Sequence, residues 1–235
     1  MADLLDTGNY DEEQKRLMAE EVILLDREDK VIGSASKKDS HMVSKGLMLH
    51  RAFSVFLFNS EGKLLLQQRA DEKITFPGFW TNTCCSHPLH REAELEDDGN
   101  AIGVKRAAVR KLFHELGIPE GDVPEDSLHW LTRLHYKAES ECGMWGEHEI
   151  DYIFITQIDL PTLAPVANEI KDTMYVSKDE LVAMLDAADS EGTYKITPWF
   201  RLIVDNFLIP VWWDALADLS SVEDRDTIHR LGPGV

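Results

Sequence analysis

Short blocks of apolar residues recur along the chain, several alternate apolar with polar side chains, and turn residues separate them. Alternation with a period of two, bounded by Gly, Asn, Asp or Ser, is typical of strands that bury one face. Residues 59–62, Asn-Ser-Glu-Gly, have the chemistry of a tight turn between two such blocks. We therefore predict two early hairpins and two later strands: 22–26 with 31–35, 52–58 with 63–68, and then 128–138 and 150–160.

Helical spacing is clearest after residue 101. Apolar side chains recur there every three or four positions, at Ile102, Val104, Ala107, Ala108, Leu112 and Leu116, and Gly117 is a natural C-terminal stop. Three more helices are predicted from local signals: an acidic surface helix within 10–20, a helix over 177–185 from the capping box of Ser177 and Glu180, and one that begins at Thr197-Pro198. This order of strands and helices indicates an α+β protein.

Length and composition favour one domain. The chain has 235 residues, of which 43% are hydrophobic, and this is enough to bury one substantial core. We predict a single compact domain over 19–216, preceded by an N-terminal extension, 1–18, and followed by a C-terminal tail, 217–235, which is polar enough to fray.

The charge balance excludes several classes of partner. Acidic side chains outnumber basic ones by 43 to 24, and the net charge of -19 repels nucleic acids and anionic membrane surfaces. We expect no membrane insertion, because no apolar run approaches the roughly 18 residues that span a bilayer. Three cysteines, two of them adjacent, indicate free thiols in a reducing compartment. We therefore expect a cytoplasmic protein, with an organellar form whose transit peptide has been removed as the alternative. The oligomeric state has no signal in the sequence.

Two short runs carry the chemistry. In an extended backbone, successive side chains point to opposite faces, so Cys85 and His87 share one face, as do Glu147 and Glu149. A thiol, an imidazole and two carboxylates can therefore converge. This inventory supplies both a metal site and a pair of proton-transfer groups.

The candidate metal ligands are three nitrogen and two oxygen donors. They are His41, His50, His87, Glu147 and Glu149. Such a set suits Zn²⁺, Mn²⁺ or Mg²⁺. An ordinary surface or core histidine remains the rival interpretation for His41, and it is the one we adopt for the other six: His90, His114, His129, His135, His148 and His229.

A second group of residues is suited to phosphate. Residues 110–118, Arg-Lys-Leu-Phe-His-Glu-Leu-Gly-Ile, resemble the second half of the Nudix box, the helix that holds metal and diphosphate in that superfamily. Lys111 and His114 replace two of its glutamates, so hydrolysis is disfavoured while Glu115 can still hold one Mg²⁺ on a substrate diphosphate. The diphosphate oxygens would meet a set of cations: Lys37, Arg69, Lys73 and Lys111.

Taken in order, the motifs resemble the type I isopentenyl diphosphate isomerases of the Nudix superfamily, from about residue 37 to residue 213. The matching runs are His50-Arg51-Ala52-Phe53-Ser54, Arg69 through Lys73 to Asn82, Cys85-Ser86-His87-Pro88, Glu115-Leu116-Gly117, Glu147-His148-Glu149 and Thr197-Pro198-Trp199. The resemblance implies a Nudix-like fold, a mixed sheet sandwiched by helices. It also implies an isomerase of isoprenoid biosynthesis that interconverts isopentenyl and dimethylallyl diphosphate through a tertiary carbocation.

The resemblance also assigns roles by position. Cys85 matches the family's catalytic cysteine and Glu149 its catalytic glutamate, while Tyr136 and Trp199 match its active-site aromatics. Tyr136 departs from the bacterial pattern, since it lies one residue farther from the glutamate pair. The five donors named above match the family's metal ligands, and Glu115 matches the ligand of the Mg²⁺ that accompanies the diphosphate.

Two alternatives and one rival residue stay open on sequence alone. A Nudix-type diphosphate hydrolase would release phosphate or diphosphate, and a non-catalytic metal-binding module would have no reactive thiol. Cys84 is the rival of Cys85, but an extended segment turns Cys84 away from His87, which makes it a small buried apolar residue.

Overall fold

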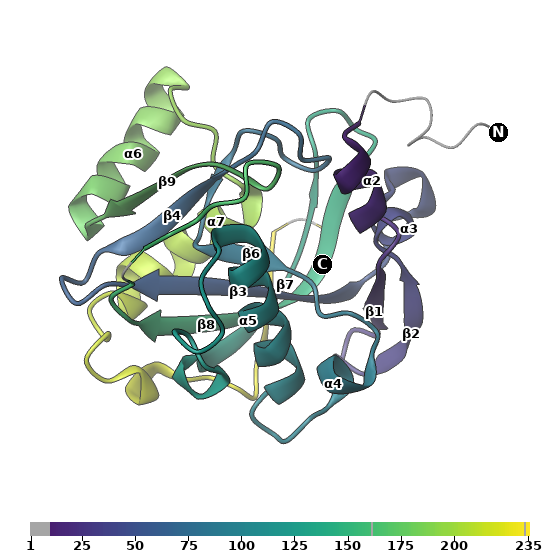
Figure 1. Ribbon diagram of the computed structural model, residues 1–235, viewed down its shortest axis with the longest axis horizontal. Helices are drawn as coiled ribbons and strands as arrows, with labels where there is room; N and C mark the ends of the chain where they lie inside the picture. Colours follow the sequence, from purple (N-terminus) through teal and green to yellow (C-terminus); the bar gives the residue numbers. More distant parts are fainter. Residues whose placement is uncertain (1–9, 161, 233) are drawn as a thin grey trace.

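One mixed sheet organises the chain (Figure 1). The computed structural model describes residues 10–160, 162–232 and 234–235, and within these ranges ten strands are joined, with a main path in the order β10-β7-β8-β3-β1-β2. The strands are β1 (Glu21–Leu25), β2 (Val31–Ser36), β3 (His50–Phe58), β4 (Leu64–Arg69), β5 (Trp80–Thr81), β6 (Cys84–Ser86), β7 (His129–Glu139), β8 (Gly146–Gln157), β9 (Ile170–Val176) and β10 (Ile228–Leu231).

Helices cover both faces of this sheet. They are α2 (Glu12–Leu17), α3 (Lys37–His41), α4 (Glu92–Leu95), α5 (Ile102–Leu116), α6 (Lys178–Glu191) and α7 (Pro198–Ile203), which continues as the π-helix η3 (Val204–Trp212); three 3-10 turns are η1 (Val43–Lys45), η2 (Glu125–Ser127) and η4 (Leu219–Val222). Among the described residues no helix has the length and apolar character to cross a membrane.

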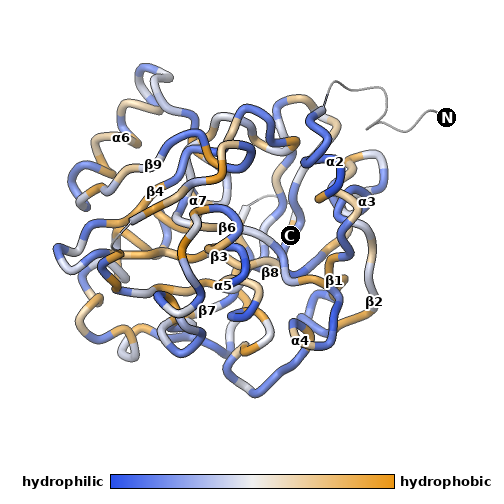
Figure 2. The backbone as a smooth tube through the Cα atoms, in the orientation of Figure 1, coloured by the Kyte–Doolittle hydropathy of each residue, from blue (hydrophilic) through white to orange (hydrophobic). Residues whose placement is uncertain are grey.

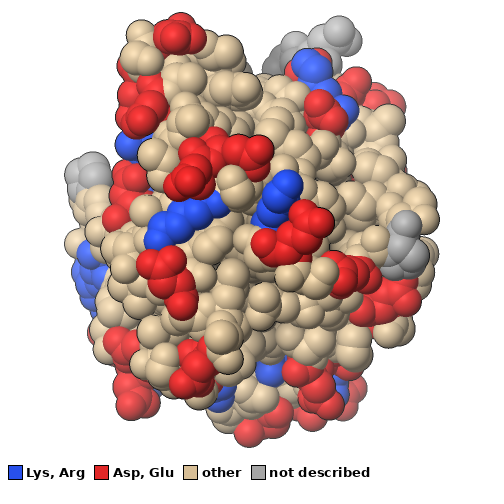
Figure 3. All heavy atoms as spheres, turned by 90° about the vertical axis from the view of Figure 1, so that its left-hand side faces the viewer, with Lys and Arg blue, Asp and Glu red and all other residues tan. Residues whose placement is uncertain are grey.

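Strand β3 is the centre of the sheet and separates two cores. Its odd-numbered side chains, such as Phe53 and Val55, pack with α5, while Phe56 and Phe58 pack on the other face with α6, α7 and η3. Hydrophobic residues are accordingly frequent in the central strands in Figure 2, and many turns are hydrophilic. Figure 3 shows that the face formed by the left side of Figure 1 carries mostly acidic charges.

The order of pairing brings distant motifs together. Strand β3 runs parallel to β8, with His50 opposite Glu149, and antiparallel to β6, with Ser54 opposite Cys85. Histidines before the first central strand, the cysteine motif and the glutamate pair therefore meet at one end of the sheet.

Most predicted elements are present, with differences that have physical causes. The first hairpin pairs as expected, and the capping box of Ser177 and Glu180 forms, although α6 continues to Glu191. The second pair of blocks touches only at Phe58 and Leu64, because β3 then pairs with β8 and β4 with β9.

The two ends of the chain also pack. In the expected extension 1–18, residues 1–9 lie outside the described residues, while α2 buries Leu17 and Met18 follows it into the core. The tail expected to fray instead adds β10 to the edge of β7 as a parallel strand. The boundaries 19–216 of the domain stay a prediction.

Candidate active site

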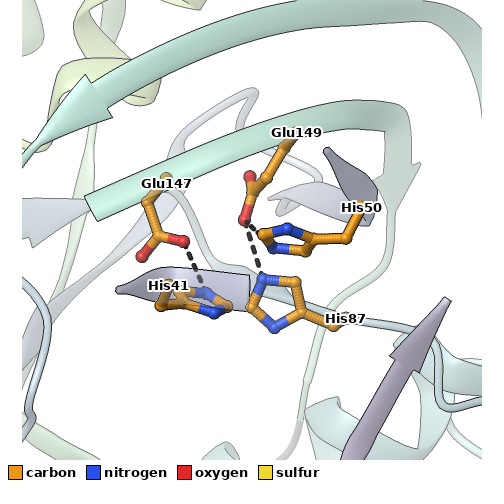
Figure 4. A group of neighbouring side chains, drawn as sticks. All are labelled: His41, His50, His87, Glu147 and Glu149. Atoms are coloured by element: carbon orange, nitrogen blue, oxygen red, sulfur yellow. Dashed lines mark hydrogen bonds and ion pairs between the residues drawn. The ribbon is translucent and has the colours of Figure 1, made fainter. Parts of the chain in front are cut away.

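Five buried donors gather where β3 and β8 begin (Figure 4). They are His41, His50, His87, Glu147 and Glu149, and one ligand atom from each lies within 4.8 Å of all the others. The two glutamates extend from β8 towards the three imidazoles, which arrive from α3, from β3 and from the segment after β6 (Figure 4). The structure thus brings together every residue of the predicted set, and His41 is not an isolated core histidine.

Local signals place these donors. Ser36 is the N-cap of α3, and its hydroxyl accepts a hydrogen bond from the backbone of Asp39; the last residue of the helix is His41. The parallel register of β3 and β8 sets His50 opposite Glu149, and the alternation of β8 turns Glu147 to the same face.

Hydrogen bonds fix the orientation of two imidazoles. Nδ1 of His41 lies 2.7 Å from the carbonyl of Lys37, and Nδ1 of His50 lies 2.8 Å from the carbonyl of Met48. A carbonyl only accepts, so each Nδ1 carries the proton and each Nε2 keeps its lone pair. Both Nε2 atoms are buried and face carboxylate oxygens of the glutamate pair, without a well-aligned hydrogen bond among the described residues. This is the tautomer that a metal ligand requires.

The charges and distances of the group fit a divalent cation. Nε2 of His41 is 2.7 Å from Glu147, and Glu149 Oε1 is 2.7 Å from Nε2 of His87 and 3.5 Å from that of His50. Two ligands held about 2.1 Å from one ion are roughly 3 to 4.2 Å apart. The 3.5 Å contact lies in this range, and the two contacts of 2.7 Å would lengthen slightly around an ion. A divalent ion would also balance the two buried carboxylates, which are costly when unpaired. The group could therefore hold a divalent metal.

A small pocket adjoins the metal group. Its volume is about 30 Å³, which leaves room for about one water molecule. Its lining includes all but three of the residues predicted for the site: Lys37, Arg69, Lys73, Cys85, His87, Glu115, Tyr136, Glu147, Glu149 and Trp199. His41 and His50 lie in the metal group behind it, and Lys111 contacts its wall through Glu115 at 3.0 Å.

The adjacent cysteines point to opposite faces. Cys85 faces the pocket, where burial raises the pKa of its thiol to about 12, so the group is neutral at physiological pH. Cys84 is fully buried in the core beneath α5. Its Sγ lies 3.7 Å from Glu115 Oε2, a polar contact that the sequence gave no reason to expect.

Tyr136 and Glu149 are directly joined. The Tyr136 hydroxyl donates a hydrogen bond to Glu149 Oε2. Burial raises the pKa of Glu149, but the imidazole of His50 and the phenol of Tyr136 outweigh burial, and the pKa lies below its ordinary value. Burial raises the pKa of Tyr136, and the charge of Glu149 adds to that shift, so the phenol stays protonated.

Trp199 is held by a residue for which we predicted no role. Its indole Nε1 donates to Asn82 Oδ1 at 3.2 Å, and Asn82 in turn donates to the carbonyls of Val55 and Cys84. Phe76 meets the indole edge-on with ring centroids 5.3 Å apart. Asn82 lies in the sequence run that leads to the cysteine motif, so its position could have marked it as a site residue. The sequence did not indicate which group its amide would contact.

Cations cluster at the pocket and include the buried Lys111 and the partly buried Lys37 and Lys73. Burial lowers the pKa of Lys37 to about 8, and the charges of Lys73 and Lys111 add to that shift. Arg69 is less available than predicted: its Nε and Nη2 donate to the carbonyls of Thr75 and Phe76. It therefore also shapes the loop that carries Phe76.

Glu169 lies among these cations, and sequence reasoning missed it. Its carboxylate is 2.5 Å from the Lys73 ammonium. Burial raises the pKa of Glu169, but the charges of Lys73 and Lys111 outweigh burial and hold it far below its ordinary value. No pattern separated this glutamate from the other acidic residues of the chain, which has 43.

Comparisons with known proteins define the class. A family model described as the NUDIX domain matches residues 48–200. A solved structure of a NUDIX hydrolase from Alicyclobacillus acidocaldarius aligns with a TM-score of 0.50 and 12% identity over 78% of this chain and 97% of that one. A solved structure of a protein from Deinococcus radiodurans aligns with a TM-score of 0.53 and 18% identity over 80% of this chain and 99% of that one. The fold is that of the NUDIX family, to which the chain belongs.

Curated relatives narrow this further. The chain is 55% identical to "Isopentenyl-diphosphate Delta-isomerase 1" of Mesocricetus auratus over 97% of this chain and 99% of that protein. It is 54% identical to the isomerase of Dictyostelium discoideum over 94% of this chain and 93% of that protein. It is 50% identical to a Cannabis sativa isomerase named chloroplastic over 98% of this chain and 81% of that protein. Within the NUDIX family the chain belongs to the isopentenyl-diphosphate Delta-isomerases, and the predicted resemblance is confirmed.

Proposed function

We propose that the protein interconverts isopentenyl diphosphate and dimethylallyl diphosphate, with Cys85 and Glu149 as its two proton-transfer groups. The observation that carries the proposal is that both groups line one small buried pocket, together with Lys37 and Lys73, cations suited to a diphosphate. Membership of the isomerase family supports the same reaction.

The reaction moves a double bond by one carbon without a net change of atoms. A proton adds to the terminal carbon of the alkene, a tertiary carbocation forms, and a proton leaves the carbon nearer the diphosphate. Two groups on different walls can give and take these protons without turning the substrate. Because the reaction is reversible, the group that donates in one direction accepts in the other.

The carbocation needs protection from water. The accessible volume of the pocket is about 30 Å³, so few water molecules can lie beside the reacting carbons. Trp199, anchored through Asn82, offers a π face to the cation, an interaction worth about 2 kcal/mol or more when it is desolvated. Tyr136 donates to Glu149 and limits the orientations of that carboxylate.

The ligand set suits Zn²⁺, Mn²⁺ or Mg²⁺, and Glu115 would hold a separate Mg²⁺ on the diphosphate. When bound, a divalent cation at the histidines and glutamates would fix the orientation of Glu149 and tune its acidity.

Hydrolysis, the activity typical of the fold, is disfavoured. Lys111 occupies the position of a glutamate of the Nudix box, and its ammonium lies 3.0 Å from Glu115. A lysine at this position cannot bind the metal ions that hydrolysis requires. The substrate we infer is a small prenyl diphosphate. We place the protein in the cytoplasm, with an organellar form as the alternative because the Cannabis sativa relative is named chloroplastic.

Incubation with isopentenyl diphosphate in D₂O tests the function. We expect deuterium in both prenyl diphosphates and the appearance of the dimethylallyl product. Release of phosphate or diphosphate without isotope uptake would establish a hydrolase instead. A metal-loaded, folded sample that gives neither result would leave the isomerase proposal refuted.

A further inference from the structure

Glu169 is a buried carboxylate at the place where the substrate's own negative charge should bind. It is 2% exposed, and Lys73, which it contacts at 2.5 Å, lines the pocket. A fixed negative charge there repels a diphosphate. Its presence therefore requires an effect that outweighs the repulsion.

The contacts of Glu169 identify that effect. Its backbone is held on both sides, since its amide donates to Val166 and its carbonyl accepts from Ala70. Its Oε1 accepts a hydrogen bond of 2.9 Å from Gln14 of α2, and its Oε2 contacts the Lys73 ammonium. The carboxylate is thus a rigid support for a flexible cation.

A free lysine side chain occupies many rotamers, and binding an anion would otherwise have to overcome this entropy. An ammonium has three donors. With one donor directed to Glu169, Lys73 keeps two for a ligand, and its position is fixed before the ligand arrives. Preorganisation of this kind raises affinity by lowering the cost of ordering.

We propose that Glu169 is a positioning residue that holds Lys73 in place for the substrate diphosphate, and that Gln14 locks Glu169 and so links helix α2 to this end of the pocket. The inference rests on the proposed function, because it takes the ligand of Lys73 to be a diphosphate.

Kinetics of Glu169→Gln test the inference. A lysine that binds the diphosphate equally in the ground and transition states affects KM and leaves kcat unchanged. We expect KM for isopentenyl diphosphate to rise about tenfold and kcat to stay within about twofold, with Glu169→Asp recovering part of the loss. Asp71→Asn is the matched control. It removes an exposed ion pair of 2.8 Å between Asp71 and Lys171, so it should change neither KM nor kcat.

A double mutant separates positioning from a general structural role. In Lys73→Met, the carboxylate no longer positions that lysine, so adding Glu169→Gln should leave KM unchanged or lower it. A further tenfold rise in that background, or a fall of kcat equal to the rise of KM in the single variant, would overturn the inference. Gln14→Leu should raise KM in the same direction by a smaller factor, and an unchanged KM would remove α2 from the proposal.

Binding of inorganic diphosphate with Mg²⁺, measured by calorimetry, keeps this test separate from the reaction. If the wild-type protein shows no isotope uptake, the proposed function fails, yet a weaker diphosphate affinity in Glu169→Gln would still support the positioning role. Equal affinities in the wild type and in a folded Glu169→Gln variant would exclude it. Should that variant not fold, the same comparison with Glu169→Asp and Gln14→Leu decides.

Discussion

The two adjacent cysteines allow one substitution to be tested against its neighbour. Cys85→Ala removes a thiol from the pocket wall, whereas Cys84→Ala removes a thiol from the core beneath α5. The side chains differ by one position in the sequence but face opposite sides of β6. We therefore expect opposite effects on rate and on stability.

The structure sets the size of each effect. Loss of one member of an acid–base pair typically reduces the rate about 10²- to 10⁴-fold. Cys84 is fully buried, so its truncation leaves a small cavity and should cost about 1 kcal/mol, or roughly 2 to 4 °C in Tm for a protein of this size. Loss of its 3.7 Å contact with Glu115 could add a modest rise in KM but should not remove turnover.

Both variants are measured with bound metal. Deuterium uptake gives the rate, and thermal unfolding gives the stability. Cys85→Ala should lose turnover and keep Tm within about 2 °C of the wild type, since the thiol is at a cavity wall. Equal and mild losses of activity in both variants would refute the assignment of Cys85. So would a larger loss of rate in Cys84→Ala than in Cys85→Ala.

Three other predictions follow from the site and its surroundings. Trp199→Leu should slow isotope uptake about 30-fold through loss of about 2 kcal/mol of cation–π stabilisation, whereas a near-normal rate would remove that role. Chelation should lower both Tm and turnover, because Glu147 and Glu149 lose their compensating charge, and an unchanged Tm would argue against a metal at this group. Burial, with the charges of His148 and Arg230, lowers the pKa of His135 from 6.5 to about 4, so the unfolded chain takes up the proton first as pH falls. Allowing for solvent screening, on the order of 1 to 2 kcal/mol of stability should be lost between those values, and a His135→Asn variant with the same pH profile of unfolding would refute this.

Local signals predicted the elements whose ends are fixed by neighbouring residues. Gly117 ends α5 with a backbone φ of 66°, and the capping box at Ser177 begins α6. Strands β5, β9 and β10 were not predicted, because β5 and β10 span 2 and 4 residues and β9 is partly exposed, so pairing with a neighbour defines them. The π-helix after α7, with Pro210 inside it, likewise depends on packing.

The convergence of the metal group was predicted for a different reason. Alternation along a strand is a local rule, so Glu147 with Glu149 and Cys85 with His87 could be paired by face. The way that β3 lies between β6 and β8 is not local and was not predicted, whereas the resemblance to a family supplied the full set of ligands. Neither the local rule nor the resemblance could identify Glu169, because its role depends on its contact with Lys73, which is 96 residues away in the sequence.

The separation of charge between surface and pocket explains how an acidic protein can bind an acidic substrate. At physiological ionic strength the Debye length is about 8 Å, so exposed carboxylates act weakly on a ligand that has entered the pocket. The lysines at its wall are largely shielded from solvent, which therefore screens their attraction less. Long anionic polymers meet mainly the surface of a chain whose net charge is -19, and this charge repels them. A small diphosphate can move from the screened surface into the pocket. The strength with which the pocket then binds it depends on how firmly Glu169 holds Lys73.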